Sequence, residues 1–421
     1  MNPIELKAWA PRPALAPVIE GDLQTGLRAA SNGSRGCYGG WELVYEAIPE
    51  GTHAQFAIEA RIAGLEDGLE SISVEAKWAG EHGQTLDWSP IYERTDGVDG
   101  WFTLSGRIAN TSGARRLVVK LLLRWSATGT VEWRNPRLTP ADPPTKRPIR
   151  LGAGSSQLGS GERTLVANRD RFVALCRRAA QEGVQLFCLP EVILSWGLPR
   201  GAEQLMDVAV EVPGEHIAPF QQVAAEFGMA ICFSVHERED DLVYNTAVLI
   251  DEQGRLAGKY RKVHLAPPEE MWQGVTPGRT FDVVRIGPGA ANVGMNICMD
   301  SSVPEAARES ARLGAEVLLL PIMGDHRADR WTRGRPQFDI ERWMLIQRMR
   351  AMDNHVFLVA ARNNGVGTGI FAPDGSILAM DGGDRSIVWA DVDLSEHKQS
   401  WTGATFKDIC WTERRPAVYG R

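Results

Sequence analysis

Hydrophobic and polar residues alternate along short runs in the first third of the chain. Within each run apolar side chains occupy every second position, which is the period of a β-strand with one buried face. Turns rich in Gly, Asp and Asn separate the runs, and no helical period interrupts them. The pattern predicts a β-sandwich over residues 1–140, with strands at Glu42–Ala47, Gln55–Ile62, Ser71–Trp78, Trp101–Ile108, Arg116–Trp125 and Thr130–Arg134.

The pattern changes at residue 149, after which helical stripes alternate with continuous apolar runs. Apolar residues recur three or four positions apart in Thr164–Gln181, and Gly183 closes this predicted helix. Val184–Leu189 is an unbroken apolar run, typical of a strand covered on both faces. The alternation predicts an α/β domain with a mixed sheet over residues 149–421, with further helices at Pro219–Phe227, Ser301–Arg312 and Asp339–Asn354.

A proline-rich segment separates the two patterns. Residues 136–148 contain five prolines, and a proline lacks the N–H that a sheet ladder or a helix interior requires. Such a composition predicts a stiff, extended spacer that continues neither pattern. We therefore predict a linker over residues 141–148 between the two domains.

Composition narrows the range of partners and compartments. A net charge of −7 and a pI near 5.7 disfavour nucleic acid and anionic membranes as partners. The six cysteines are scattered without a pairing pattern, which suits a reducing compartment. We find neither a signal-peptide pattern nor an apolar run of the roughly 18 residues that a membrane span needs. We therefore expect a cytoplasmic protein that binds neither nucleic acid nor membranes.

Three reactive side chains follow predicted strands and make a coherent chemical set. Cys298 ends the run VGMNIC, Glu191 follows the run ending at Leu189, and Lys262 lies in the segment KYRKVHL. Sites in open α/β sheets gather at the carboxyl ends of strands, so these residues are expected to meet. A carboxylate can take the proton of a thiol and later pass it to a leaving amine, while an ammonium group can stabilise an oxyanion.

Each of these residues also has a structural explanation. A glutamate after a strand is usually a surface carboxylate, and a lone cysteine is usually inert packing. Lys262 lies in a basic cluster, which is usually a solvated face, and His264 is interpreted as a hydrogen-bonded packing residue rather than a partner of Cys298. Taken together, the three residues favour a catalytic interpretation.

The second domain resembles the nitrilase superfamily, the carbon–nitrogen hydrolases with a Glu–Lys–Cys triad. The resemblance runs from about Ile149 to the end of the chain and rests on several motifs in the family's order. These are LFCLPE, YNTAVLIDEQGRLAGKYRKVHL, GMNICMDSSVPEAARESARLGAEVLLLPI, RWMLIQRMRAMDNHVFLVAARNNG and GIFAPDGSIL. The resemblance implies a four-layer αββα sandwich that dimerises. The segment LLLRWSATGTVEWRNPRL resembles the last strand pair of galactose-binding-like jelly rolls, which implies a jelly-roll accessory domain.

The resemblance also implies roles for individual residues. Glu191 would be the general base and acid, Lys262 the oxyanion stabiliser, and Cys298 the nucleophile that forms a thioester. The backbone N–H of Met299 would be a second oxyanion donor. A second glutamate often follows the lysine in the family; Glu269 and Glu270 both qualify, and we favour Glu270 because the segments after it fit the pattern better.

The substrate class follows from the residues around the cysteine and stays open in part. Cys298-Met299-Asp300 resembles the amidase and carbamoylase branches, because nitrile-cleaving branches commonly follow the cysteine with Trp-Glu. We expect hydrolysis of an amide or N-carbamoyl bond of a small molecule. The segment Gly324–Arg335, with His326 and Arg327, is either a substrate loop that recognises a carboxylate or a solvated loop.

Competing functions remain at this stage. Nitrile hydrolysis and acyl transfer could use the same triad. A carbohydrate-binding or scaffold protein is a third possibility, because seven of the fourteen tryptophans fall in the first domain; we favour core packing for them. The sequence contains no GxSxG elbow, no metal-ligand spacing and no phosphate-binding glycine loop, so we expect neither a metal nor a cofactor.

Overall fold

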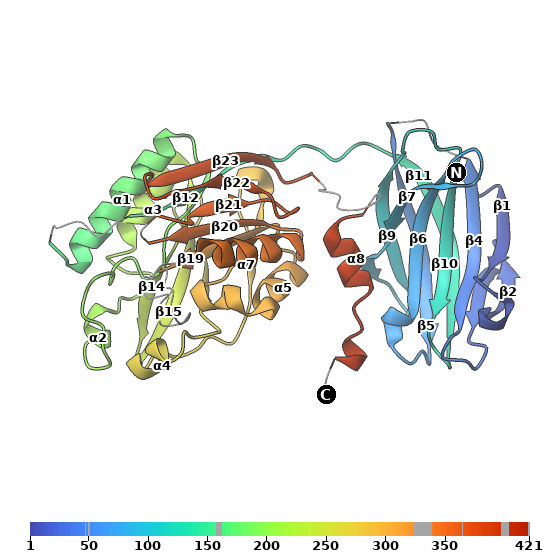
Figure 1. Cartoon of the computed structure of the whole chain (residues 1–421), viewed down its shortest axis with the longest axis horizontal. Helices are drawn as coiled ribbons and strands as arrows, with labels where there is room; N and C mark the ends of the chain where they lie inside the picture. The colour runs from blue at the N-terminus through green and yellow to red at the C-terminus, as the bar shows by residue number, and fades with distance from the viewer. Residues whose placement is uncertain are drawn as a thin grey trace. The chain divides into compact units, whose positions relative to one another are not determined.

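The chain divides into two compact units (Figure 1). The computed structural model describes residues 1–46, 48, 51–156, 162–323, 339–363, 365–396 and 404–419. Residues 1–145 and 399–421 form the first unit, and residues 146–398 form the second. The first boundary falls within the predicted linker, whereas the predicted second domain extended to residue 421. Among the helices described, none is both long and apolar enough to cross a lipid bilayer.

Two antiparallel sheets make up most of the first unit. One has five strands in the order β1-β4-β10-β6-β7, and the other has six in the order β2-β3-β11-β5-β9-β8. The strands are β1 (Glu5–Trp9), β2 (Val18–Asp22), β3 (Gly26–Ala30), β4 (Tyr38–Glu46), β5 (His53–Ala63), β6 (Ile72–Ala79), β7 (Thr85–Pro90), β8 (Glu93–Asp96), β9 (Phe102–Ala109), β10 (Arg116–Arg124) and β11 (Thr130–Ala141).

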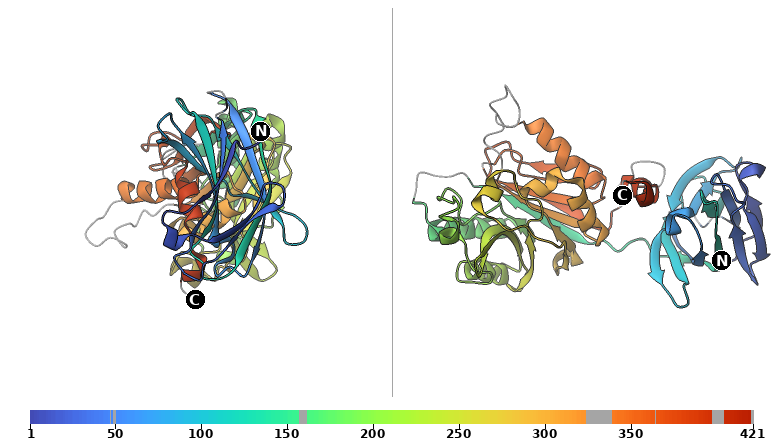
Figure 2. Two further views of the ribbon diagram at one scale, coloured as in Figure 1. Left: turned by 90° about the vertical axis from the view of Figure 1, so that its right-hand side faces the viewer. Right: turned by 90° about the horizontal axis from the view of Figure 1, so that it is seen from below.

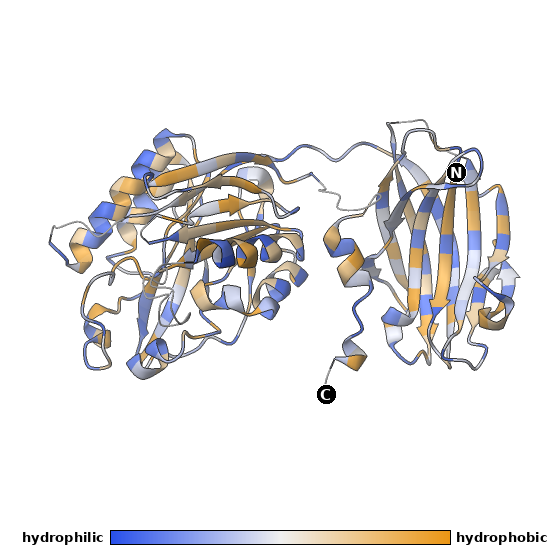
Figure 3. Cartoon of the chain, in the orientation of Figure 1, coloured by the Kyte–Doolittle hydropathy of each residue, from blue (hydrophilic) through white to orange (hydrophobic). Residues whose placement is uncertain are grey.

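The core of this unit lies between the two sheets. Alternate residues of β5 and β9 point inward and are buried, and the intervening residues are more exposed. Figure 3 shows this alternation as bands of hydrophobic and hydrophilic residues along the strands. Trp78 and Trp133 are buried in this core, together with Tyr45 and Phe56, whose rings pack edge to face. For these two tryptophans, core packing is the role that the structure describes.

Strand β11 extends into the proline-rich segment, contrary to the prediction that this segment continues no sheet. Pro140 pairs in register with Ala54 of β5, and the register shifts between Arg134 and Arg137. Asn135, within this shift, has a φ of 54°, so the strand bulges around Pro136. Beyond the bulge only β5 pairs with β11, since the ladder with β3 ends at Trp133. A proline is tolerated there because the side of β11 that has no partner strand requires no backbone N–H for a ladder hydrogen bond.

The first unit also contains a helix from the far end of the chain, α8 (Phe406–Thr412). Arg124 at the end of β10 is buried and donates to the carbonyl of Thr412 at 2.6 Å and to Glu413 Oε1 at 2.9 Å. The guanidinium of Arg415 lies over the ring of Trp125, 4.1 Å from its centroid. These contacts are the reason that residues after 398 group with the β-sheets rather than with the second unit.

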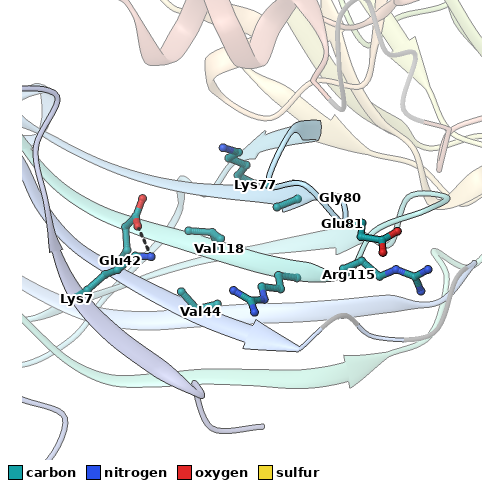
Figure 4. Close-up of a pocket in the computed structure, with 11 residues that line it drawn as sticks. Lys7, Glu42, Val44, Lys77, Gly80, Glu81, Arg115 and Val118 are labelled. Atoms are coloured by element: carbon teal, nitrogen blue, oxygen red, sulfur yellow. Dashed lines mark ion pairs between the residues drawn. The ribbon is translucent and has the colours of Figure 1, made fainter.

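A cavity of about 550 Å³ lies on the face of the five-stranded sheet that points away from the core (Figure 4). Glu42 is buried there between two lysines, at 3.6 Å from Lys7 and 3.4 Å from Lys120. Lys77, Arg115 and Arg116 line the same cavity. The lining of this cavity is therefore charged rather than aromatic.

Two six-stranded sheets form the centre of the second unit. Their orders are β16-β15-β14-β13-β12-β23 and β17-β18-β19-β20-β21-β22. The strands are β12 (Pro148–Gly154), β13 (Leu186–Cys188), β14 (Ala230–Glu239), β15 (Leu242–Ile250), β16 (Leu256–Arg261), β17 (Val283–Arg285), β18 (Asn292–Met295), β19 (Val317–Ile322), β20 (Phe357–Arg362), β21 (Gly369–Phe371), β22 (Ile377–Met380) and β23 (Ile387–Asp393). In each sheet three adjacent strands are parallel.

A buried apolar layer joins these two sheets, and helices cover their outer faces. Leu151 and Cys188 of the first sheet belong to one core with Leu319 and Val359 of the second. Figure 2 shows the green helices α1 (Leu165–Gln181) and α3 (Ala218–Phe227) on one side of the sheets and the orange helix α7 (Ile340–Met352) on the other. Helix α5 (Pro304–Arg312) packs against β18 and α7. Two short helices also belong to this unit, α2 (Leu205–Val208) and α4 (Glu269–Gln273).

Local sequence signals explain the two helices on the first sheet. The side chain of Thr164 accepts a hydrogen bond from the N–H of Ala167 and caps the start of α1. Gly228 ends α3 with a φ of 65°, a left-handed conformation that glycine adopts at little cost. Phe220 of α3 packs on Phe233 of β14 with ring centroids 4.4 Å apart. Burying each such ring contributes about 2–3 kcal/mol.

Candidate active site

The carboxyl ends of parallel strands from both sheets bring the candidate residues together. Glu191 follows β13, and its side chain is buried. Lys262 follows β16 and is 1% exposed. Cys298 follows β18 and is half-buried. Within the first sheet β13 and β16 run in the same direction, so the residues that follow them lie at the same edge of that sheet.

Lys262 forms the centre of a buried network. Its Nζ lies 2.9 Å from Glu191 Oε1 and 2.7 Å from Glu270 Oε2. The neighbouring Lys259 and Arg261 point the other way, to the buried Glu237. Strand alternation therefore separates Lys262 from the basic cluster in which the sequence places it.

The structure distinguishes the two adjacent glutamates. Glu270 is buried against Lys262, and its Oε2 also accepts the N–H of Ala266 at 2.6 Å. Glu269 is exposed at the start of α4. Only Glu270 is therefore in a position to orient the lysine directly.

Asn245 of β15 joins the two buried carboxylates. Its Nδ2 lies 2.7 Å from Glu191 Oε1 and 2.8 Å from Glu270 Oε1, and its Oδ1 accepts a hydrogen bond from Ser234. The backbone N–H of Met323 donates to the other oxygen of Glu191 at 2.7 Å. Sequence reasoning missed Asn245 and Met323. An asparagine inside the apolar strand YNTAVLI is a signal that could have found the first, because a buried amide needs partners.

Cys298 lies in a strained turn. Its φ is 43°, a left-handed conformation that is uncommon for residues other than glycine. The turn Cys298–Ser302 is a 3-10 helix, and α5 begins only at Pro304, after the start that the sequence predicted. Asp300 accepts the N–H of Ile297 at 2.8 Å and so closes the turn around the cysteine. Such strain, where it is held by surrounding contacts, is frequent at functional sites.

Burial and neighbouring charges set the protonation of these groups. Burial, the charge of Glu191 and a hydrogen bond to Glu191 raise the pKa of the Cys298 thiol well above its ordinary value. Burial opposes the charge of Lys262, but Glu191, Cys298 and Glu270 raise the pKa of its ammonium group overall. Burial also opposes the charge of Glu270, but Lys262 and the hydrogen bonds of Ala266 and Asn245 lower its pKa. Lys262 therefore stays charged, and the thiol keeps its proton until a base removes it.

The remaining predicted residues are placed as follows. Met299 directly follows Cys298 in the 3-10 turn and is half-buried. His264 lies just beyond β16 rather than inside a strand, and its Nδ1 is 2.8 Å from Asp300 Oδ1. His326 and Arg327 lie outside the residues that the structure describes.

A buried hydroxyl–imidazole pair lies near this network. Ser195 Oγ is 2.9 Å from His236 Nδ1. Burial, aided by the charge of Arg200, lowers the pKa of His236 to about 3. Its imidazole therefore binds a proton too weakly to act as a general base near neutral pH. The pair is packing within the site rather than a second catalytic centre.

Comparison with known proteins identifies the family. The family model described as carbon-nitrogen hydrolase matches residues 152–400. The chain belongs to the carbon-nitrogen hydrolase family. It is therefore an amidohydrolase, and the resemblance to the nitrilase superfamily that the motifs indicate is confirmed.

Similar proteins come from animals and bacteria. This carbon-nitrogen hydrolase is 31% identical over 244 residues to an omega-amidase of Xenopus tropicalis, over 54% of this chain and 83% of that protein. It is 31% identical over 246 residues to an omega-amidase of Bos taurus, over 54% of this chain and 84% of that protein. A carbon-nitrogen hydrolase structure from Helicobacter pylori G27 aligns with a TM-score of 0.50 and 23% identity, over 59% of this chain and 90% of that chain. The similarity to the Helicobacter pylori structure concerns the fold alone.

Proposed function

We propose that this hydrolase cleaves a small-molecule amide through a triad of Glu191, Lys262 and Cys298. The observation that carries the proposal is the buried Lys262 ammonium, held between Glu191 and Glu270 beside the thiol. Taking a lysine and two carboxylates out of water is costly unless they pair, as they do here. An arrangement of this kind supports catalysis more than stability, because apolar residues would fill the same space with less desolvation.

The acylation step uses all three side chains. Glu191 takes the thiol proton as Sγ of Cys298 attacks the amide carbon, and the carbonyl electrons move onto oxygen. Lys262 and the N–H of Met299 stabilise this oxyanion. The oxyanion then re-forms the carbonyl, the C–N bond breaks, and Glu191 gives its proton to the nitrogen. A primary amide thus releases ammonia and leaves a thioester on Cys298.

Hydrolysis of the thioester restores the enzyme. Glu191 takes a proton from a water molecule, whose oxygen attacks the thioester carbon and forms the second tetrahedral intermediate. The C–S bond breaks, the sulfur recovers the proton from Glu191, and the acid leaves. The role of Glu270 is to hold Lys262, because their charges pair at 2.7 Å.

The comparisons and the cysteine motif together support one class of substrate. The relatives are named omega-amidases, which favours an amide over a nitrile. An N-carbamoyl compound is the second candidate, because Cys298-Met299-Asp300 is common to both branches. Release of ammonia from a panel of primary amides, carbamoyl amino acids and nitriles separates these activities.

The organisation of the chain completes the proposal. We propose that the helix and sheet layers of the second unit are the four-layer αββα sandwich of the family. We propose that the first unit is a jelly-roll accessory domain. A cytoplasmic location and a homodimer stay predictions from the sequence, as do substrate contacts of Glu269, His326 and Arg327.

Replacing the nucleophile tests the mechanism. Cys298→Ala is expected to lower amide hydrolysis by at least about 10⁴-fold, because no thioester can form. Cys298→Ser is expected to be similarly inactive, since a serine hydroxyl is a far weaker acid than a thiol. The measurement is ammonia release, with circular dichroism to establish folding. The matched control is Cys410→Ala, which changes a cysteine of the first unit. This variant should hydrolyse amides as the wild-type protein does. Turnover by purified Cys298→Ala would overturn the mechanism.

A further inference from the structure

The outward face of the five-stranded sheet carries charges in an ordered pattern. Lys7 of β1 and Lys120 of β10 lie in register on the two sides of Glu42 of β4. The Glu42 carboxylate is buried, 3.6 Å from the ammonium group of Lys7 and 3.4 Å from that of Lys120. Opposite charges on adjacent strands stabilise a sheet. The carboxylate of Glu42 is therefore already neutralised within the protein.

Two valines form the next row of this face and make an apolar floor. Val44 of β4 lies opposite Val118 of β10, and Lys77 of β6 lies opposite Val118 on its other side. Val44 is 2% exposed. Figure 4 shows the two valines between Glu42 and Arg115, in the cavity of about 550 Å³. Lys77 therefore has a valine rather than a carboxylate as its neighbour on β10.

Two arginines add to the positive charge of the cavity. Arg116, the first residue of β10, lies in register with Ala79 of β6 and Glu46 of β4, and Arg115 precedes it in the chain. Both arginines line the cavity together with Lys77. Within the part of the chain that the structure describes, no acid forms an ion pair with any of these three cations. Their charges are thus left uncompensated.

The lining as a whole has an excess of positive charge. It contains four cations and two carboxylates, and one of the carboxylates, Glu42, is shared by two lysines. The other is Glu81, an exposed residue between β6 and β7. Several arginines elsewhere in the first unit do have acidic partners: Arg28 pairs with Glu20, Arg61 with Glu132, and Arg134 with Glu59. The unpaired cations of the cavity point to an anion that arrives from outside.

The size of the cavity and the charge of the chain define the class of this anion. A cavity of about 550 Å³ has the size of a small-molecule site. The chain as a whole carries a net charge of −7, which disfavours nucleic acids and other long polyanions. Guanidinium and ammonium groups bind phosphate and carboxylate oxygens, and the valine floor suits the carbon atoms of an organic molecule. These features favour a small organic molecule with at least two negative charges.

We propose that the first unit binds a small organic anion with two or three negative charges in this cavity. Lys77, Arg115 and Arg116 bind its phosphate or carboxylate groups, and Val44 and Val118 contact its carbon atoms. The cavity lies within the first unit, so the proposal does not rest on the thiol chemistry of the second.

Three probes test the need for charge and its source. Glycerol 3-phosphate and citrate carry phosphate and carboxylate groups, and glycerol lacks both. Calorimetry should show saturable binding of one or both anions and none of glycerol. Raising the salt concentration from about 20 to about 300 mM should weaken this binding, because salt screens the attraction. The bound anion should also raise the unfolding temperature of the first unit. Binding of a single anion would support the proposal and identify a phosphate or a carboxylate site.

Substitutions locate the binding. Arg116→Gln and Lys77→Gln each remove one charged donor from a different strand, and each should raise Kd by about 10-fold. Arg116→Lys should keep part of the affinity, because it keeps the charge and loses the bidentate geometry. The matched control is Arg107→Gln, which removes an exposed arginine of β9 in the other sheet. This control should bind the anion and hydrolyse amides as the wild-type protein does.

Three results would overturn the proposal. The first is the absence of saturable binding of both anions at low salt. The second is glycerol binding as tight as that of the anions. The third is an equal loss of affinity in Arg107→Gln and in the two cavity variants, because the attraction would then depend on overall charge rather than on the cavity. Circular dichroism establishes that each variant folds.

Discussion

Asp300 connects the two segments that supply the proposed nucleophile and the proposed oxyanion stabiliser. One of its oxygens accepts from Ile297 and from the hydroxyl of Tyr260, each at 2.8 Å. The other accepts from the backbone and the imidazole of His264, at 3.0 and 2.8 Å. The aspartate thus fixes the turn of Cys298 against the chain that follows Lys262. The Cys-x-Asp motif has a structural role here, whichever amide is the substrate.

The His264–Asp300 pair predicts a pH-dependent contribution to stability. A hydrogen bond to Asp300 raises the pKa of His264, with the charges of Asp300 and Glu305 adding to it against burial. A raised folded-state pKa means that the contribution is complete below the unfolded value of about 6.5 and is lost as the pH rises through the folded value. His264→Gln should therefore lower Tm more at pH 5.5 than at pH 9. The measurement is thermal unfolding of both proteins across this range, and a pH-independent difference would contradict the prediction.

The site was predictable where side chains belong to recognisable motifs. Glu191 and Cys298 lie at the ends of apolar runs, and Lys262 lies in the segment KYRKVHL, so the sequence indicated them as candidates. Asn245 was not predictable in the same way, because it lies within a strand. The Met323 contact uses a backbone N–H, which carries no residue-specific signal.

At the scale of the element, a buried arginine contacts the end of α8. Arg124 donates to the carbonyl of Glu70 as well as to Thr412 and Glu413, so it joins the sheet, the short turn before β6 and the helix. Thr405 caps α8 by accepting from the N–H of Asp408. A seven-residue helix is unstable alone, so these contacts determine whether it forms.

Removing this arginine should destabilise the first unit. Arg124→Met deletes three hydrogen bonds and leaves two half-buried carbonyls without this donor, which we expect to lower the free energy of unfolding by about 2 kcal/mol. Urea unfolding followed by tryptophan fluorescence measures the change. Arg116→Met alters an exposed arginine of the same strand and is the matched control. Equal stability of the two variants would show that α8 docks by other contacts.

Long strands were easier to predict than edge strands. The predicted run Gln55–Ile62 lies within β5, and Arg116–Trp125 differs from β10 by one residue at its end. The short strands β1, β2, β3, β7 and β8 were not predicted. All four residues of β8 are exposed, so no alternation of apolar and polar side chains marks it. The extension of β11 was missed because one-sided pairing, which tolerates proline, depends on the neighbouring strands.

At the scale of the whole molecule, the second unit is inserted between two parts of the first. Residues 1–145 precede it and residues 399–421 follow it. The three residues of the proposed triad lie in the second unit. We therefore expect the first unit to depend on the C-terminal residues for its stability.

A shortened chain tests this division. A protein that ends at Glu396 lacks α8, so Arg124 loses two of its acceptors and the ring of Trp125 loses its contact with Arg415. We expect the unfolding transition of the first unit to move to lower temperature, while amide hydrolysis stays within about twofold. Calorimetry measures the thermal unfolding of both units. Loss of amide hydrolysis during heating identifies the unfolding transition of the second unit. An unchanged unfolding temperature of the first unit would contradict the role proposed for α8.

The place of α8 in the chain also sets an order of events during synthesis. The ribosome makes β1 to β11 first, yet the helix that covers Arg124 is translated only after the entire hydrolase unit. Nascent domains usually complete their folding from the N-terminus onward. Here we expect the reverse order. The second unit can reach its native state while the first unit still lacks α8.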